Sequence, residues 1–239
     1  MKIIYFENGR KFLIKDTSKD FHTKDGIVKK SFFKKKKGKT NMGKEFIVFD
    51  ASFIDKYRRI KRTAQIILPK DIGFIISECG LGKESVVLDA GAGSGGVACF
   101  LANIVSKVYT FDNDKRHLEC TKDNVKMLDL KNVEVIERDI YEKGFGKKNA
   151  DCIILDLKEP WRCIDHCKKA LKPGGFLVVY TPHITQALQF ENENHEKNAF
   201  IPVRTIEVFE REWKLKGKIS RPEFVPLGHS AFLGFFRGR

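Results

Sequence analysis

The sequence has no long hydrophobic run, since its apolar stretches fall far short of the roughly 20 residues that a membrane-spanning helix needs. Its beginning, Met-Lys-Ile-Ile-Tyr-Phe-Glu, lacks the long apolar stretch and the small-residue cleavage site of a signal peptide. The chain also shows no internal repeat. We therefore expect a cytoplasmic protein with no membrane partner. Its 239 residues suffice for one α/β domain and a small additional module.

The chain also lacks two Cys/His pairs with the spacing of a zinc site. Its six cysteines are scattered, and several lie in apolar strand or helix patterns, as expected of buried free thiols in a reducing compartment. Cys163-x-x-His166-Cys167 has the spacing of half a metal site, but no second pair completes it. We therefore favour a helix without ligands here and expect no metal.

Positive charge is concentrated at one end of the sequence. The net charge is +14, and residues 1–62 hold 19 Lys/Arg against 7 Asp/Glu, whereas the rest of the chain is nearly neutral. A basic module of this kind usually has a polyanionic partner, most often a nucleic acid. The alternative for the run Lys34–Lys37 with Lys39 is a solvated loop that binds nothing.

The first 50 residues are rich in strand-like runs. These runs lie at 3–6, 11–14 and 45–49, and Glu7-Asn8-Gly9-Arg10 is a hairpin signal between the first two. A basic helix is expected over 52–66. We therefore predict a small β-rich N-terminal module over residues 1–62, followed by a larger domain over 63–239.

After Pro69 the pattern changes to helical stretches that alternate with short apolar strands. The strands are expected at 86–89, 107–111, 133–137, 151–156 and 175–180. Such alternation predicts βαβ units and an α/β, Rossmann-like, doubly wound sheet that is mostly parallel. The last stretches, near 203–214 and 228–236, are expected to form antiparallel strands at the sheet edge.

A glycine loop follows the first of these strands. Val86-Val87-Leu88-Asp89 leads into glycines at 91, 93, 95 and 96, which satisfy both G-x-G-x-x-G and G-x-G-x-G. Glycines allow a tight turn and a close approach of the backbone to a ligand. Asp89 lies where a pyrophosphate would approach and would repel it, but it suits the ammonium group of a bound amino acid. S-adenosylmethionine carries such a group and no phosphate, so it is favoured over NAD.

Two further acids follow the next two strands. Asp112 comes 21 residues after Gly91, where an acid can accept hydrogen bonds from both ribose hydroxyls. Asp139 follows the third strand and could bind the adenine amino group. Ligands of open α/β sheets bind at these carboxyl ends. The alternative is that Asp89, Asp112 and Asp139 are ordinary loop residues, helix caps included.

Asp156 ends the fourth strand, beside the first strand of a doubly wound sheet. The string Leu155-Asp156-Leu157-Lys158-Glu159-Pro160-Trp161 resembles a motif of the tRNA (adenine-N1)-methyltransferases, the family that modifies adenosine 58 of the T-loop. The sequence also resembles this family at Leu88 to Gly96, Pro69-Lys70-Asp71, Arg221-Pro222 and Gly228-His229-Ser230-Ala231-Phe232-Leu233. Phe21-His22 and Gly43-Lys44-Glu45-Phe46 are similar to its N-terminal module, so the resemblance spans nearly the whole chain.

The resemblance implies a class I methyltransferase that forms a homotetramer, uses S-adenosylmethionine and acts on tRNA. It implies that Asp156 is the catalytic residue and that His117 lies near the cofactor. Some archaeal-type members of the family also act on position 57, and the resemblance leaves open whether this chain does. The residues that we expect to bind the cofactor are Asp89, Gly91, Gly93, Ser94, Gly95, Gly96, Val97, Asp112, His117 and Asp139. The sequence departs from the family at Leu68, where an aromatic residue often precedes Pro-Lys-Asp.

Four alternatives remain open. One is a methyltransferase for protein or for another RNA base, although an exocyclic-amine methylase usually carries Asn/Asp-Pro-Pro-aromatic where this chain has Asp156-Leu157-Lys158-Glu159. Another is a non-catalytic RNA-binding subunit, which should have lost the glycine loop or the acid. A third is a nicotinamide-dependent dehydrogenase, whose pyrophosphate would meet Asp89. The fourth is that Asp156 only caps the helix after it.

Overall fold

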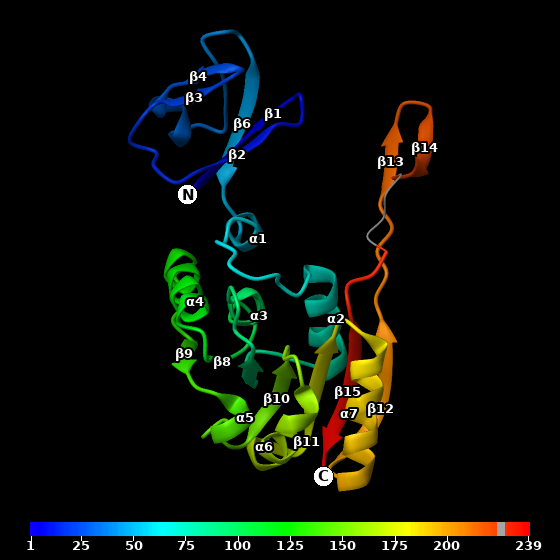
Figure 1. The fold of residues 1–239 in the computed structure, drawn as a ribbon. Helices are drawn as coiled ribbons and strands as arrows, with labels where there is room; N and C mark the ends of the chain where they lie inside the picture. Colours follow the sequence, from blue (N-terminus) through cyan, green and yellow to red (C-terminus); the bar gives the residue numbers. More distant parts are fainter. Residues whose placement is uncertain (224–227) are drawn as a thin grey trace. The chain divides into compact units, whose positions relative to one another are not determined.

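The computed structural model describes residues 1–223 and 228–239, which form two compact units, Met1–Arg59 and Ile60–Arg239 (Figure 1). Residues 60–62 belong to the second unit. The Lys61 N–H donates to Asn124 Oδ1 at 2.8 Å, and the Asn124 side-chain amide donates to the Lys61 carbonyl at 2.9 Å. The separate roles expected for the two parts of the chain stay a prediction.

The N-terminal unit is built on an antiparallel sheet with strand order β2-β1-β6-β5. Alternate residues of β1 and β6, such as Ile4, Phe6, Phe46 and Val48, are buried in its core. The expected strands and the hairpin between β1 and β2 are confirmed. The elements are β1 (Lys2–Phe6), β2 (Lys11–Ile14), β3 (Phe21–Thr23), β4 (Gly26–Val28), the 3-10 helix η1 (Lys30–Lys34), β5 (Lys37–Lys39), β6 (Glu45–Asp50) and α1 (Phe53–Tyr57).

The second unit contains a seven-stranded sheet with strand order β12-β15-β11-β10-β7-β8-β9. The strands β7 to β11 are parallel, and β15 pairs antiparallel with both β11 and β12. The predicted Rossmann-like sheet is therefore confirmed. Its strands are β7 (Val86–Ala90), β8 (Lys107–Asp112), β9 (Val133–Glu137), β10 (Ala150–Leu155), β11 (Leu171–Thr181), β12 (Phe200–Glu207) and β15 (Phe232–Gly238).

Helices cover both faces of this sheet, and each face has its own apolar core. On one face Ile72, Ile75 and Leu101 are buried, and on the other Ile164, Cys167 and Phe190 are buried. The helices are α2 (Pro69–Cys79), α3 (Gly96–Leu101), α4 (Lys115–Met127), α5 (Ile140–Lys143), the 3-10 helix η2 (Pro160–Cys163), α6 (Ile164–Ala170) and α7 (Ile184–Lys197). Within the described part of the chain, no helix is both long and apolar enough to cross a membrane.

The prediction of a helix over 52–66 is wrong beyond the first turn. A capping box of Ser52 and Asp55 starts α1, but α1 ends at Tyr57. The basic residues that follow would lie three or four positions apart on a helix, where like charges repel. Their backbone is held instead by the second unit, because Ser94 Oγ accepts the N–H groups of Thr63 and Ala64 at 2.9 and 3.0 Å.

The expected C-terminal edge strands are confirmed only in part. β12 ends at Glu207, and β15 begins at Phe232 rather than near 228. Between them, β13 (Trp213–Lys216) and β14 (Ile219–Pro222) form a separate two-stranded hairpin. Gly217, with φ of +59°, occupies the first turn position, which favours this local hairpin over one long strand.

Candidate active site

A cavity of about 480 Å³ lies at the carboxyl ends of β7, β8 and β10. Most of the predicted site residues line it, so the sheet brings together side chains that are far apart in the sequence. The predicted residues that line the cavity are Gly91, Gly93, Ser94, Gly96, Val97, Asp112, His117 and Asp156.

Gly91 follows β7 directly and lies against Asp156, the residue that follows β10. Its φ is +94°, and a Cβ placed on it would lie 2.1 Å from the carbonyl oxygen of Asp156. The Asp156 N–H donates to the Ala90 carbonyl at 2.9 Å, which continues the strand pairing to the cavity. Any side chain at position 91 would therefore displace Asp156.

Ser94 links the glycine loop to the segment before α2. Its hydroxyl is buried, accepts the Thr63 and Ala64 N–H groups, and donates to the Ala64 carbonyl at 3.1 Å. Gly95 is the N-cap of α3 with φ of +74°, and it packs against Thr121 rather than lining the cavity. Ser94 and Gly95 thus shape the loop from behind.

Asp112 organises the second strand end. Its Oδ2 accepts the Gly93 N–H at 2.9 Å and lies 3.3 Å from His117 Nδ1, and its Oδ1 accepts the Asp114 N–H at 2.9 Å. Each carboxylate oxygen has more than one acceptor position, so both can still accept bonds from a ligand. The carboxylate is held in a fixed orientation at the cavity wall.

Asp139 lies in an adjoining hollow of about 50 Å³ rather than in the main cavity. It caps α5, because its Oδ1 accepts the Tyr141 N–H at 2.9 Å, and its Oδ2 accepts the Asn113 amide at 3.2 Å. The helix-cap alternative therefore describes part of what Asp139 does. Asp112, Asn113 and Tyr141 line both spaces.

Asp89 lies within β7, buried and behind the cavity wall. Its Oδ2 accepts the Thr110 hydroxyl at 2.7 Å, whereas its Oδ1 is buried with no hydrogen-bond partner among the described residues. The pKa of Asp89 is raised to about 7, mainly by burial and less by the nearby carboxylates of Asp156 and Asp112, while the hydrogen bond from Thr110 acts to lower it. A positive charge nearby would stabilise the ionised form of Asp89.

Asp156 follows β10 and is partly buried at the cavity. Burial raises the pKa of Asp156 to about 7. Within the described residues, no donor lies within hydrogen-bonding distance of its carboxylate. An acid in a cavity with a raised pKa and unused acceptor capacity is a candidate functional group. Its alternative role as a cap of the following helix receives no support, because η2 has no side-chain cap.

Two motifs that lie 160 residues apart meet beside this acid. Lys70 Nζ donates to Asp71 Oδ1 and to Ser230 Oγ, both at 2.7 Å, and Ser230 Oγ donates to Asp71 Oδ2 at 3.0 Å. Tyr180, on β11, bonds to Ser230, and its pKa is raised by burial and by the carboxylates of Asp71 and Asp156. Tyr180 therefore connects this network to the surroundings of Asp156, although none of the four residues lines the cavity.

Several residues that line the cavity were not predicted from the sequence. These are Ala92, Asn113, Tyr141, Leu157 and Lys158, and the segment Ala64–Ile67. Leu157 and Lys158 directly follow the predicted acid, and this position could have indicated them. Residues 64–66 were expected in a helix, and neither they nor Ile67 carried a signal for the cavity.

The cysteines form no metal centre in the described part of the chain. All six are free thiols, and Cys163 and Cys167 are buried in the core. His166 Nε2 lies 3.1 Å from the Tyr141 carbonyl oxygen. No group of three or more His, Cys, Asp or Glu side chains in the described ranges could hold a metal ion.

The strand order, the glycine loop and the acids at the strand ends define a class I methyltransferase fold. Solved structures agree. A Thermotoga maritima structure described as a SAM-dependent O-methyltransferase matches with a TM-score of 0.88 and 30% identity, covering 99% of this chain and 92% of that one. The tRNA (m1A58) methyltransferase TrmI of Aquifex aeolicus matches with a TM-score of 0.84 and 26% identity, covering 99% and 95%.

The family is defined by sequence as well. The model of the family described as "tRNA methyltransferase complex GCD14 subunit" matches residues 58–225. The Methanocaldococcus jannaschii tRNA (adenine(57)-N(1)/adenine(58)-N(1))-methyltransferase TrmI is 31% identical over 97% of this chain and 93% of its own length. The Thermus thermophilus tRNA (adenine(58)-N(1))-methyltransferase TrmI is 33% identical over 82% and 78%. The chain belongs to this tRNA methyltransferase family.

Replacing Gly91 should damage the site more than replacing an ordinary loop glycine. We expect Gly91→Ala to lower the free energy of unfolding by roughly 2–4 kcal/mol, because the new methyl group meets the Asp156 carbonyl and the φ is positive. Urea denaturation measures this. Gly82→Ala is the matched control, since nothing lies within 4 Å of a Cβ there. Equal stability of the two variants would contradict the close approach.

Proposed function

We propose that this chain is a cytoplasmic enzyme that transfers a methyl group from S-adenosylmethionine to N1 of adenosine in the tRNA T-loop. The target is position 58, with position 57 as a second target to be tested. The observation that carries the proposal is the Asp156 carboxylate, which lines the cavity with a raised pKa and has no hydrogen-bond partner among the described residues, in a chain of this family.

The residues of the cavity fit S-adenosylmethionine. The cofactor supplies a methyl group on a positively charged sulfur, and its amino acid end carries an ammonium group. The buried carboxylates of Asp89 and Asp156 both gain from a positive charge, and the unpartnered Asp89 Oδ1 is an acceptor for a donor. A pyrophosphate beside these carboxylates would be repelled, which disfavours NAD.

The other two acids, Asp112 and Asp139, suit the nucleoside part of S-adenosylmethionine. The glycine loop gives access to backbone groups, and the fixed carboxylate of Asp112 can accept the ribose hydroxyls. Asp139, in the adjoining hollow of about 50 Å³, is placed to accept from the adenine amino group, with His117 at the cavity wall. Ser94 and Val97 also line the cavity.

Asp156 is proposed to act on the target base. Adenine N1 already has a lone pair, so alignment of the base lowers the barrier more than a strong base would. Asp156 can accept a hydrogen bond from the exocyclic N6 amine and stabilise the positive charge that develops on the ring. Its neighbours Leu157 and Lys158 line the same cavity.

The target base must leave its stack before it can react, because N1 lies on the pairing edge. Binding of the rest of the tRNA would offset that cost. The N-terminal module supplies the charge for this task, since residues 1–62 carry a balance of +12. The intact glycine loop and acid argue against a non-catalytic RNA-binding subunit.

We also propose that the protein is a homotetramer. The outer strand β12 has an unpaired edge in the sheet, and Ile201 and Val203 on it are 47% and 45% exposed. In the β13–β14 hairpin, Trp213 and Leu215 are 56% and 73% exposed. Exposed apolar residues on edge strands favour pairing with another chain.

Binding of S-adenosylmethionine should release protons at pH 6.5. Both acids have pKa values of about 7, so they are mostly protonated there, and a bound cation lowers those values. Calorimetry in two buffers of different ionisation enthalpy measures the protons released, and affinity should rise with pH up to about 8. Fewer protons should be released when S-adenosylhomocysteine, which lacks the sulfonium charge, binds to the protein. Fewer should also be released when S-adenosylmethionine binds to the variant Asp89→Asn. Equal enthalpies in both buffers would contradict this account.

Removing the Asp156 carboxylate should slow methyl transfer with the protein still folded. A charged hydrogen bond is worth roughly 1.5–3 kcal/mol, so we expect Asp156→Ala to lose about one to two decades in rate. Asp156→Asn should be nearly as slow, because its amide can donate where an acceptor is needed. Single-turnover rates at saturating tRNA and cofactor measure the effect. The control is Asp165→Ala, an exposed acid on α6, and transfer by Asp156→Ala at the rate of this control would move the role elsewhere.

Light scattering should give about four times the chain mass of 27.4 kDa at micromolar concentration. Ile201→Asp on β12 should lower that mass, because a charge would be buried at the strand edge. Met42→Asp, at a residue 61% exposed in the N-terminal unit, is the control and should leave the mass unchanged. A single-chain mass for the unaltered protein would show that no tetramer forms.

A further inference from the structure

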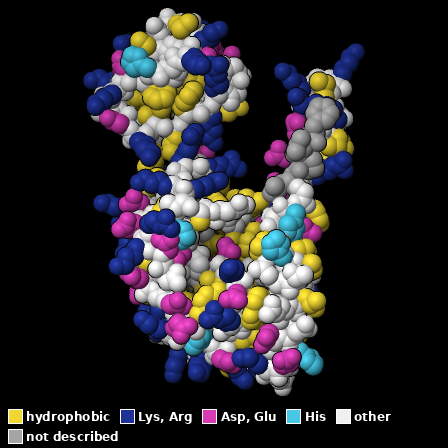
Figure 2. Space-filling model, in the orientation of Figure 1, with side chains coloured by type: hydrophobic (Ala, Val, Ile, Leu, Met, Phe, Trp, Pro, Cys, Tyr) yellow, Lys and Arg dark blue, Asp and Glu magenta, His cyan; other side chains and the backbone are white. Residues whose placement is uncertain are grey.

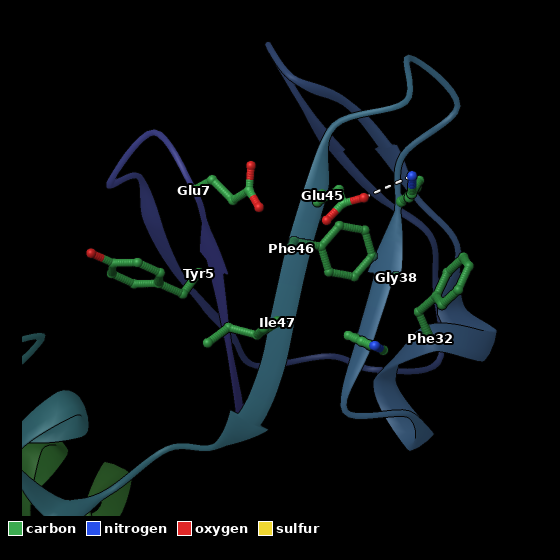
Figure 3. A pocket seen from close by; sticks show the side chains of 9 residues that line it. Tyr5, Glu7, Phe32, Gly38, Glu45, Phe46 and Ile47 are labelled. Atoms are coloured by element: carbon green, nitrogen blue, oxygen red, sulfur yellow. Dashed lines mark ion pairs between the residues drawn. The ribbon is translucent and has the colours of Figure 1, made fainter.

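The N-terminal unit has a hollow of about 680 Å³ on its antiparallel sheet (Figure 3). Tyr5 on β1 and Ile47 on β6 lie side by side there, and Lys37 on β5 is the next neighbour. These residues form one row across three strands. The hollow lies within residues 1–59 and is separate from the candidate active site.

Side chains of this row face away from the core. Tyr5 is 41% exposed and Ile47 is 49% exposed, whereas their neighbours Phe6 and Phe46 are buried on the opposite face. Figure 2 shows hydrophobic side chains at the surface of this unit among Lys and Arg side chains. An aromatic ring and a branched side chain at the surface can contact a flat apolar group.

The wall of the hollow has a fixed shape. Gly38 pairs with Phe46 across β5 and β6, and a Cβ on Gly38 would lie 2.5 Å from the Phe32 ring. The Phe32 ring packs edge-on against Phe46 at 5.6 Å. Because this packing admits no side chain at position 38, β5 is held close to the core beside the exposed row.

The lining of the hollow is balanced in charge, with Lys37 and Lys39 against Glu7 and Glu45, and the excess positive charge comes from the neighbouring lysines Lys34–Lys36 and from the rest of the unit. Glu45 is paired with Lys39 at 2.7 Å, but none of Lys34–Lys37 forms an ion pair with a described residue. Residues 1–59 hold 17 Lys/Arg against 7 Asp/Glu, a balance of +10. A second copy of this unit would be repelled, whereas a polyanion would be attracted.

RNA combines the two properties that this surface fits. Its phosphates match the lysines, and an unpaired base offers a flat face for an aromatic ring. We propose that an unpaired nucleotide of the tRNA lies on Tyr5 and Ile47, with its backbone phosphates on Lys37 and the adjacent lysines. This rests on the proposed tRNA substrate and adds the contact surface and a stacking contribution to binding.

Anisotropy with the full-length protein tests the two contributions separately. The probes are a tRNA transcript, a single-stranded 12-nucleotide oligoadenylate and inorganic polyphosphate, which has no bases. Tyr5→Ala should bind both RNAs about tenfold more weakly and leave polyphosphate binding unchanged. Lys37→Gln should weaken all three and reduce the slope of log K against log salt by about 0.7–0.9.

Matched variants control for folding and general charge. Tyr5→Phe keeps the ring and should bind like the unaltered protein. Phe49→Ala removes an aromatic residue that is also 41% exposed on β6 but does not line the hollow, and Lys19→Gln removes an exposed lysine outside it. Both should bind RNA normally, and Tyr5→Ala should keep its kcat at saturating tRNA while its KM rises.

Three results would overturn the inference. The first is that Tyr5→Ala binds oligoadenylate as tightly as Phe49→Ala does. The second is that Tyr5→Ala weakens the binding of polyphosphate as much as the binding of RNA. Alternatively, Tyr5→Ala could lower the oligomer mass, which would make this face a contact between copies. The proposed function is judged separately by methyl transfer to tRNA by the unaltered protein, so the two ideas can fail independently.

Discussion

The close approach of β7 and β10 at the cavity is the constraint on which the site depends. Gly91 lies against the Asp156 carbonyl with no space for a side chain, and this contact sets where Asp156 leaves its strand. The same two strands hold Asp89 and Asp156 near each other in a poorly solvated region, and burial raises the pKa of both acids to about 7. A bound cation stabilises the ionised forms of both acids. The packing contact between Gly91 and Asp156 therefore connects the fold to the preference for a cationic cofactor.

The rest of the second unit holds this arrangement in place from several sides. Ser94 fixes the segment before α2 against the glycine loop, and Asp112 fixes the loop against β8. On the β11 side, the buried pair of Lys70 and Asp71 joins Ser230 from the end of the chain. The glycine loop and the segment around Asp156 meet at one cavity, and the Lys70-Asp71 and Ser230 motifs bond to each other, which explains in physical terms why residues so far apart in the sequence belong together.

The sequence was sufficient to predict the parallel sheet and the acids at its strand ends, because apolar runs that end in a polar residue mark strand ends directly. It was insufficient where tertiary contacts decide the backbone. Residues 58–66 were expected to be helical, but the N–H groups of Lys61, Thr63 and Ala64 donate to Asn124 and Ser94, which holds this segment in a non-helical path. The β13–β14 hairpin depends on the turn at Gly217. The position of Asp89 behind the wall, rather than at it, follows from its side-chain direction in β7, which the pattern of residues did not reveal.

The most direct test is nucleoside mass spectrometry of a tRNA transcript incubated with the protein and S-adenosylmethionine. The account predicts N1-methyladenosine in a transcript with adenosine at position 58. It also predicts loss of that product when position 58 is changed to guanosine in a transcript that has no adenosine at position 57. A methyl group on a ribose oxygen or on another base, or no methylated nucleoside with a protein that binds the cofactor, would contradict it.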